Sequence, residues 1–523
     1  MAAIRQHTHA RIRAGCSVVM SIGAAVAALS PLPASAQALT SIQSLRVSYN
    51  TRKVTAQPTG ELKTNLDSID RDIATATRLG QTSEVRRLLA HAGVLLSGKP
   101  WNDVADFNSS LLLRTDHQVV ESQKPYAVRL EQLYSPNITL VHGLSTHASL
   151  IGRPAGATTQ PFTTVKDFGM IDGVSRDLRE SPFLMELDLH DVADGRYSLT
   201  VQVLDSGRTL GTVVLPIVVR KGIDQTVTGL EAAAASAPEA LRAEILYPVD
   251  RLHNVNRGRL ELRTFDVERD IANAESVVAA IKAKKDPFAG RTGDIKRHYA
   301  LDAAGEIMPY HLYIPSKYKT GTSAPVIIAL HGLGGTEDAF FDVYGKKLPM
   351  LAEENGYIIA APLGYRVDGG YGFGLGPVPI DLTVRRSTEL SEMDVMAVLA
   401  QVRKLYNVDA NRIYLLGHSM GAIGAWKLAP KYPDIWAAVA AFSGQGVVAT
   451  AEQMKRIPNF VVHGDADATV NVRGSRTMVE AMKALNMDVT YVEVPGGSHS
   501  GVVEPNLAGA VQFFNAHRKT VVN

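Results

Sequence analysis

The chain has 523 residues, and its 54 lysine and arginine residues nearly balance its 52 aspartate and glutamate residues. Hydrophobic residues make up 46% and charged residues 20%, an ordinary globular composition that excludes a collagen-like or disordered chain. The length predicts two or three domains, and the net charge of +2 disfavours nucleic-acid binding.

Residues 1–36 have the pattern of a signal peptide. Arginines precede an apolar run over residues 14–29, and Ala34-Ser35-Ala36 fits a cleavage site. A buried helix or a membrane anchor is disfavoured because the run is short. The single cysteine, Cys16, lies in this segment, so a chain cleaved after Ala36 has no disulfide and no cysteine-based metal site. No later stretch is apolar enough to span a bilayer, which predicts a periplasmic or secreted protein.

Three segments without evident chemistry follow. Residues 37–107 place apolar side chains at helical spacing and are expected to form a helical segment. Residues 108–222 change to a period of two, with turn signals such as Asp194-Gly195, which predicts an immunoglobulin-like β-sandwich. Its histidines, His142, His147 and His190, lack metal-ligand spacing. Residues 223–290 return to helical spacing as a helical connector.

Residues 291–523 alternate apolar strands with helices. Residues 326–330, 357–362 and 412–417 are expected to be buried strands, and residues 389–406 a long helix. This alternation predicts a doubly wound, mostly parallel sheet with helices on both faces.

The strongest chemical signal is Gly417-His418-Ser419-Met420-Gly421, where a predicted strand becomes a helix. A serine on such a turn projects its hydroxyl away from the sheet, so Ser419 is the predicted nucleophile. His499, in a glycine-rich loop after the last strand, is the predicted base. Asp467 is the predicted acid that orients the base, and Asp465 competes for that role.

The oxyanion of the reaction needs backbone N–H donors. One is expected from Met420, directly after the nucleophile. The second is expected from Leu333, in the loop His331-Gly332-Leu333-Gly334-Gly335 that follows a buried strand. His331 is expected to shape this loop rather than to react.

With these motifs, the C-terminal part of about 230 residues resembles secreted α/β-hydrolase serine esterases. This group contains polyhydroxybutyrate depolymerases and feruloyl or acetylxylan esterases. It is also similar to the catalytic domains of prolyl oligopeptidase-type peptidases. Besides the nucleophile and oxyanion motifs, the matching motifs are Glu392-Met-Asp-Val, His463-Gly-Asp-Ala-Asp-Ala-Thr-Val and Gly-Ser-His499. The resemblance implies the same triad and does not cover residues 1–290.

A glycine-rich loop at residues 364–376 carries Tyr365, Tyr371 and Phe373. It follows a predicted strand at the end where ligands bind such sheets, so the rings could stack on a phenolic or sugar group. Alternatively, they fill a local core. The sequence contains no nucleotide-binding or zinc motif, so no cofactor or metal is predicted.

These observations predict a secreted serine hydrolase, with an α/β-hydrolase catalytic domain, that cleaves carboxylic esters through an acyl-enzyme. The expected partner is an ester substrate, with a plant phenolic, an acetylated sugar or a polyester as candidates. The alternatives are a prolyl oligopeptidase-type peptidase and a binding or adhesion protein on an inert hydrolase scaffold.

Overall fold

The structure is a computed structural model that describes residues 9–10, 42–153, 161–373 and 382–519. They fall into two compact units, one of residues up to 236 with 248–273 and one of residues 237–247 with 274–523. The predicted signal peptide lies outside the described residues apart from β1 (His9–Ala10), which pairs with β7 (Phe183–Leu187).

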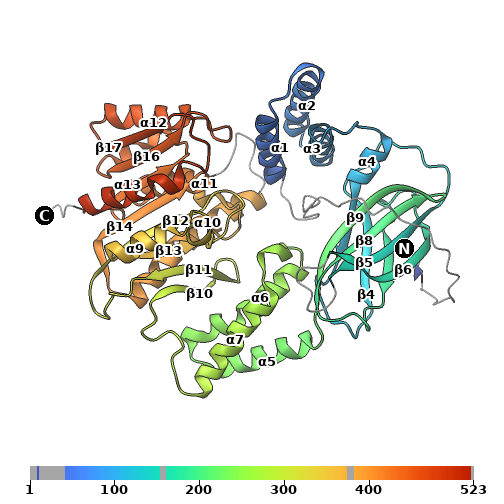
Figure 1. Cartoon of the computed structure of the whole chain (residues 1–523), viewed down its shortest axis with the longest axis horizontal. Helices are drawn as coiled ribbons and strands as arrows, with labels where there is room; N and C mark the ends of the chain where they lie inside the picture. Colours follow the sequence, from blue (N-terminus) through green and yellow to red (C-terminus); the bar gives the residue numbers. More distant parts are fainter. Residues whose placement is uncertain (1–8, 11–41, 154–160, 374–381, 520–523) are drawn as a thin grey trace, which may run out of the picture. The chain divides into compact units, whose positions relative to one another are not determined.

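The first unit begins with helices α1 to α4, which cover residues 42–110 with short breaks (Figure 1). In α2 the buried residues recur at three- and four-residue steps, which places one apolar face against its neighbours. The bounds of these helices are Ile42–Ala56 (α1), Gly60–Arg78 (α2), Thr82–Leu96 (α3) and Asp103–Ser110 (α4).

Two β-sheets follow in the same unit, with strand orders β1-β7-β4-β2 and β3-β9-β8-β5-β6. Inward side chains of both sheets, such as Val128 and Val201, share one apolar core. The immunoglobulin-like classification of this region stays a prediction. The further strand bounds are Leu111–Thr115 (β2), Val119–Val120 (β3), Tyr126–Gln132 (β4), Leu144–Gly152 (β5), Thr163–Val174 (β6), Gly195–Asp205 (β8) and Arg208–Val219 (β9).

The region predicted as a connector, 223–290, does not form a unit of its own. It contains α5 (Ile223–Ser236), α6 (Glu239–Asn256), the short η1 (Leu262–Thr264) and α7 (Val267–Lys282). Its residues are divided between the two units because they pack against different parts of the chain. Residues such as Leu252 and Phe265 share an apolar cluster with Val218 of the first unit, whereas Glu244 pairs with Arg297 of the second.

The second unit is built on an eight-stranded sheet of order β10-β11-β13-β12-β14-β15-β16-β17. Strands β10 and β11 are antiparallel, and the strands from β13 to β17 run parallel. The bounds are Gly293–Leu301 (β10), Glu306–Ile314 (β11), Ala324–Leu330 (β12), Ile358–Pro362 (β13), Val408–His418 (β14), Ala438–Phe442 (β15), Asn459–Gly464 (β16) and Val489–Val494 (β17).

Helices cover both faces of this sheet, as Figure 1 shows for the orange and red part of the chain. Alternate residues of β12 and β14 enter two separate cores, one built with α10, α11 and α12 and the other with α8, α9 and α13. This is the doubly wound, mostly parallel arrangement expected of residues 291–523. The helix bounds are Ala339–Asp342 (α8), Lys347–Asn355 (α9), Leu382–Leu405 (α10), Met420–Lys431 (α11), Arg473–Ala484 (α12) and Val503–Ala516 (α13).

Candidate active site

Ser419 occupies a strained turn between a buried strand and a helix. Strand β14 ends at His418, helix α11 begins at Met420, and Ser419 between them has φ 56° and ψ −118°. A positive φ is unfavourable for serine, and such strain persists only where the surroundings impose it. Here the Ser419 amide donates to the Phe442 carbonyl at 2.9 Å. The turn also requires Gly421, because a Cβ on that residue would lie 2.0 Å from the Leu330 carbonyl oxygen.

His499 and Asp467 lie in line with the serine hydroxyl. The Ser419 Oγ lies 2.9 Å from His499 Nε2, and His499 Nδ1 lies 2.7 Å from Asp467 Oδ2. Because a carboxylate can only accept, Nδ1 carries the proton and Nε2 is left to accept the serine proton. The three residues come from three loops at the carboxyl ends of β14, β16 and β17, which the parallel sheet brings to one edge.

Asp467 rather than Asp465 contacts the histidine. The second oxygen of Asp467, Oδ1, accepts the amides of Thr469 and Val470 at 2.8 and 2.9 Å. Burial favours a raised pKa for Asp467, but hydrogen bonds from His463, His499 and the Val470 amide outweigh it and hold the pKa well below its ordinary value. Asp465 instead accepts the Gly496 amide at 2.6 Å, so it anchors the loop that carries His499.

The loop after β12 lies directly against the serine turn. A Cβ on Gly332, the residue before Leu333, would fall 3.3 Å from the Ser419 Cβ, so the backbone of this loop approaches the nucleophile turn closely. Among the described residues, neither the Leu333 nor the Met420 amide donates to another protein group. His331 is buried, and burial lowers its pKa. Its Nε2 lies 2.7 Å from the Leu363 carbonyl oxygen, which ties this loop to the loop after β13.

The three aromatic residues of the glycine-rich loop differ in their surroundings. Tyr371 is 0% exposed and belongs to the sheet core, so it fills a local core and has no surface for a substrate. Tyr365 is half-buried, its hydroxyl donates to Glu306 at 3.2 Å, and Arg366 stacks over its ring at 3.8 Å. Phe373 is also half-buried. Residues 374–376 of this loop lie outside the described residues.

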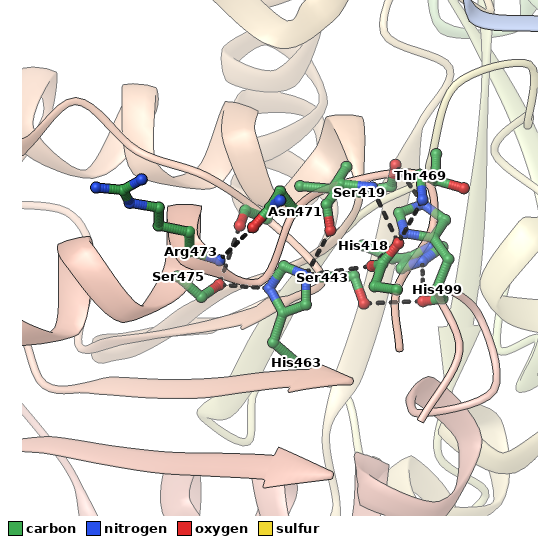
Figure 2. A network of polar contacts seen from close by, with 12 residues as sticks. His418, Ser419, Ser443, His463, Thr469, Asn471, Arg473, Ser475 and His499 are labelled. Atoms are coloured by element: carbon green, nitrogen blue, oxygen red, sulfur yellow. Dashed lines mark hydrogen bonds and ion pairs between the residues drawn. The ribbon is translucent and has the colours of Figure 1, made fainter. Parts of the chain in front are cut away.

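Several polar residues without a predicted role extend this network (Figure 2). His463 Nε2 lies 3.2 Å from Asp467 Oδ2, and its Nδ1 lies 2.7 Å from the Ser475 hydroxyl. On the other side of the site, His418 and Ser443 both contact the backbone carbonyl of His499. His418 and His463 stand inside the motifs that carry the resemblance, whereas nothing in the sequence marks Ser443.

The described ranges contain neither a metal-binding cluster nor a membrane-spanning helix. There, no group of three or more His, Cys, Asp or Glu side chains is arranged to hold a metal ion. Likewise, none of the helices that the structure describes combines the length and apolar character needed to cross a bilayer.

Residues 385–517 match the phospholipase/carboxylesterase family. That stretch contains Ser419, Asp467 and His499. The chain is 31% identical over 134 residues to feruloyl esterase B of Neurospora crassa, covering 26% of this chain and 43% of that protein. It is 27% identical over 161 residues to a bifunctional acetylxylan esterase/xylanase of Neocallimastix patriciarum, covering 31% and 22% respectively.

Among solved structures, a ferulic acid esterase from Anaeromyces mucronatus is similar at 19% identity and a TM-score of 0.37, covering 44% of this chain and 94% of that one. The chain spans less than half the length of the two curated relatives above, 43% and 22%. The family match and these relatives confirm the resemblance predicted from the motifs: the C-terminal part of this chain resembles the α/β-hydrolase carboxylesterases.

Proposed function

We propose that this protein is a secreted or periplasmic serine hydrolase that cleaves carboxylic esters through an acyl-enzyme. The observation that carries the proposal is the hydrogen-bonded line from Ser419 through His499 to Asp467, at 2.9 and 2.7 Å, on a strained strand-to-helix turn. The family match supports the same chemistry for the segment that holds all three residues. The leader-like sequence at residues 1–36 supports the location.

In the proposed reaction, His499 Nε2 accepts the Ser419 proton as Oγ attacks the ester carbonyl carbon. The negative charge that develops on the carbonyl oxygen is stabilised by the amides of Leu333 and Met420. His499 then protonates the departing alcohol, which leaves an acyl group on Oγ. Water, deprotonated by the same imidazole, releases the acid and regenerates the serine.

Asp467 has two roles in this scheme. It holds the His499 proton on Nδ1, and its negative charge stabilises the imidazolium that forms during each proton transfer. Its lowered pKa keeps it ionised at neutral pH, and its hydrogen-bonded backbone partners prevent rotation of the carboxylate.

For the substrate, we propose an ester of a phenolic acid or an acetylated sugar, because the relatives named above are feruloyl and acetylxylan esterases. Residues 37–290 lie outside the matched segment, and we propose that they position a bulky substrate rather than supply chemistry.

The test is a substrate panel with p-nitrophenyl acetate, methyl ferulate, acetylated xylan, a polyester and a peptide p-nitroanilide. The wild-type protein should hydrolyse at least one ester, and Ser419→Ala should lose that activity while its circular dichroism spectrum is unchanged. Cleavage of the anilide alone would favour the peptidase. No turnover together with no reaction towards a fluorophosphonate would favour the binding protein and overturn the proposal.

A further inference from the structure

The loop that carries His499 is held by the backbone of that residue as well as by its side chain. The Ser443 hydroxyl donates to the His499 carbonyl oxygen at 2.8 Å, and His418 Nε2 approaches the same oxygen at 3.1 Å (Figure 2). One carbonyl therefore accepts from two side chains on different elements, since Ser443 follows β15 and His418 ends β14.

The partners of His418 determine where its proton lies. A carbonyl oxygen only accepts, so Nε2 must carry the hydrogen, and Nδ1 is free to accept the Tyr344 hydroxyl at 2.7 Å. In the neutral imidazole, which is 4% exposed, both ring nitrogens therefore have a hydrogen-bond partner. Burial, together with the nearby His499, lowers the pKa of His418 to about 4, which keeps this neutral form at physiological pH.

The loop itself has little intrinsic rigidity. Gly496 and Gly497 precede His499, and Gly501 follows it, so the backbone has wide conformational freedom. Yet the imidazole must meet Ser419 and Asp467 at the same time. Because His418 directly precedes Ser419, a hydrogen bond from its ring to His499 fixes the base loop relative to the nucleophile turn.

We propose that His418 and Ser443 are positioning residues that clamp the His499 carbonyl and so hold the imidazole in line with Ser419. The proposal rests on the proposed function, because it concerns the same reaction. Neither residue touches the reacting atoms in this scheme, so their loss should lower kcat and leave KM nearly unchanged.

The sharpest test is a matched pair of substitutions, His418→Gln and His418→Asn. A glutamine amide nitrogen lies close to the position of Nε2 and can still donate to the His499 carbonyl. An asparagine amide reaches only the position of Nδ1, near Tyr344. We expect His418→Asn to lose about tenfold in kcat and His418→Gln less than about threefold, with KM within about twofold in both.

A second pair of variants examines the other donor. Ser443→Ala should lower kcat about threefold, since His418 still holds the carbonyl. The double variant Ser443→Ala/His418→Asn should lose more than the product of the two single losses, because the carbonyl then has no side-chain donor. As a control, His311→Gln removes another buried imidazole of the same unit, one that binds Asp338 and contacts neither Ser419 nor His499. It should lower thermal stability and retain wild-type kcat.

A spectroscopic measurement separates this proposal from the proposed function, because it needs no substrate. The proton between His499 Nδ1 and Asp467 should give a downfield proton NMR resonance that is protected from exchange and disappears in Asp467→Ala. We expect it to persist in His418→Gln and to broaden in His418→Asn and in the double variant. An unchanged resonance in the double variant would overturn the clamp whether or not an ester substrate is found, and where a substrate is found an unchanged kcat in that variant would also overturn it. If His418→Asn does not fold, the same resonance is measured in Ser443→Ala and Tyr344→Phe. Broadening in either variant supports the clamp, and an unchanged resonance in both overturns it.

Discussion

The orientation of Asp467 makes Asp467→Asn a substitution whose outcome can be derived atom by atom. Oδ1 accepts two backbone amides, from Thr469 and Val470, at 2.8 and 2.9 Å. An asparagine must therefore place its carbonyl oxygen at that position. Its NH2 group then takes the place of Oδ2, facing His499 Nδ1, which lies 2.7 Å from Oδ2 in the wild-type protein.

An NH2 group at that position forces the opposite tautomer on the base. His499 Nδ1 would have to accept, its proton would move to Nε2, and Nε2 could no longer accept the proton of Ser419. In Ser-His-Asp enzymes this substitution lowers kcat about 10⁴-fold. We expect a loss of about that size here, which corresponds to about 5 kcal/mol of transition-state stabilisation.

The assay is steady-state hydrolysis of p-nitrophenyl acetate at neutral pH, with Asp465→Asn as the matched control. Among the described residues, Asp465 accepts the Gly496 amide and contacts neither Ser419 nor His499, and an asparagine carbonyl oxygen can accept that amide equally well. The control should therefore stay within about threefold of wild type. The tautomer argument is refuted if Asp467→Asn keeps a tenth of the wild-type kcat, or if the two variants lose activity equally.

Three further predictions concern stability, each measured by urea unfolding. The pKa of His418 falls from 6.5 to about 4 on folding. As the pH falls, the His418 imidazole is therefore protonated at a higher pH in the unfolded chain than in the folded one. About 3 kcal/mol of stability that is present above pH 6.5 should be lost as the pH falls to about 4. His418→Gln should reduce that loss, and an equal loss in the variant would count against the assignment. Gly421→Ala should destabilise by several kcal/mol or prevent folding, because its Cβ would meet the Leu330 carbonyl oxygen at 2.0 Å. The control Gly229→Ala, on a helix with nothing within 4 Å, should be neutral or stabilising, and equal effects would contradict the packing argument. Glu244→Gln should cost about 3 kcal/mol, since it leaves the buried Arg297, 2.6 Å from Glu244, without a charge partner, and an unchanged midpoint would mean that the pair contributes nothing.

The parallel sheet was predictable because its strands are apolar on both faces and its helices are periodic. Glycines flank Ser419 in the sequence, and the structure shows why Gly421 has no side chain: a Cβ on it would lie 2.0 Å from the Leu330 carbonyl oxygen. Asp467 and Asp465 stand two residues apart on one loop, and only the three-dimensional path of that loop shows which carboxylate faces His499.

The polar support of the site could not be predicted, because it depends on long-range contacts without a spacing rule. Ser443 meets His499 across 56 positions of sequence. Tyr371 had the same sequence signal as Tyr365, yet only the structure shows that its ring is entirely buried. The sequence also could not predict which parts of the chain the helices of residues 223–290 pack against. Helical periodicity identifies an apolar face but does not show which core that face enters, and these helices contribute to both units.

In the proposed reaction Ser419 carries the acyl group, and trapping the acyl-enzyme identifies the residue that is acylated. The protein is mixed with excess p-nitrophenyl acetate, quenched in acid within the first turnover and analysed by intact mass and peptide mapping. We predict one added acetyl group, located on Ser419, in the wild-type protein, and none in Ser419→Ala. An acetyl group on another residue that forms at the catalytic rate, or ester turnover that persists in Ser419→Ala, would show that Ser419 is not the nucleophile.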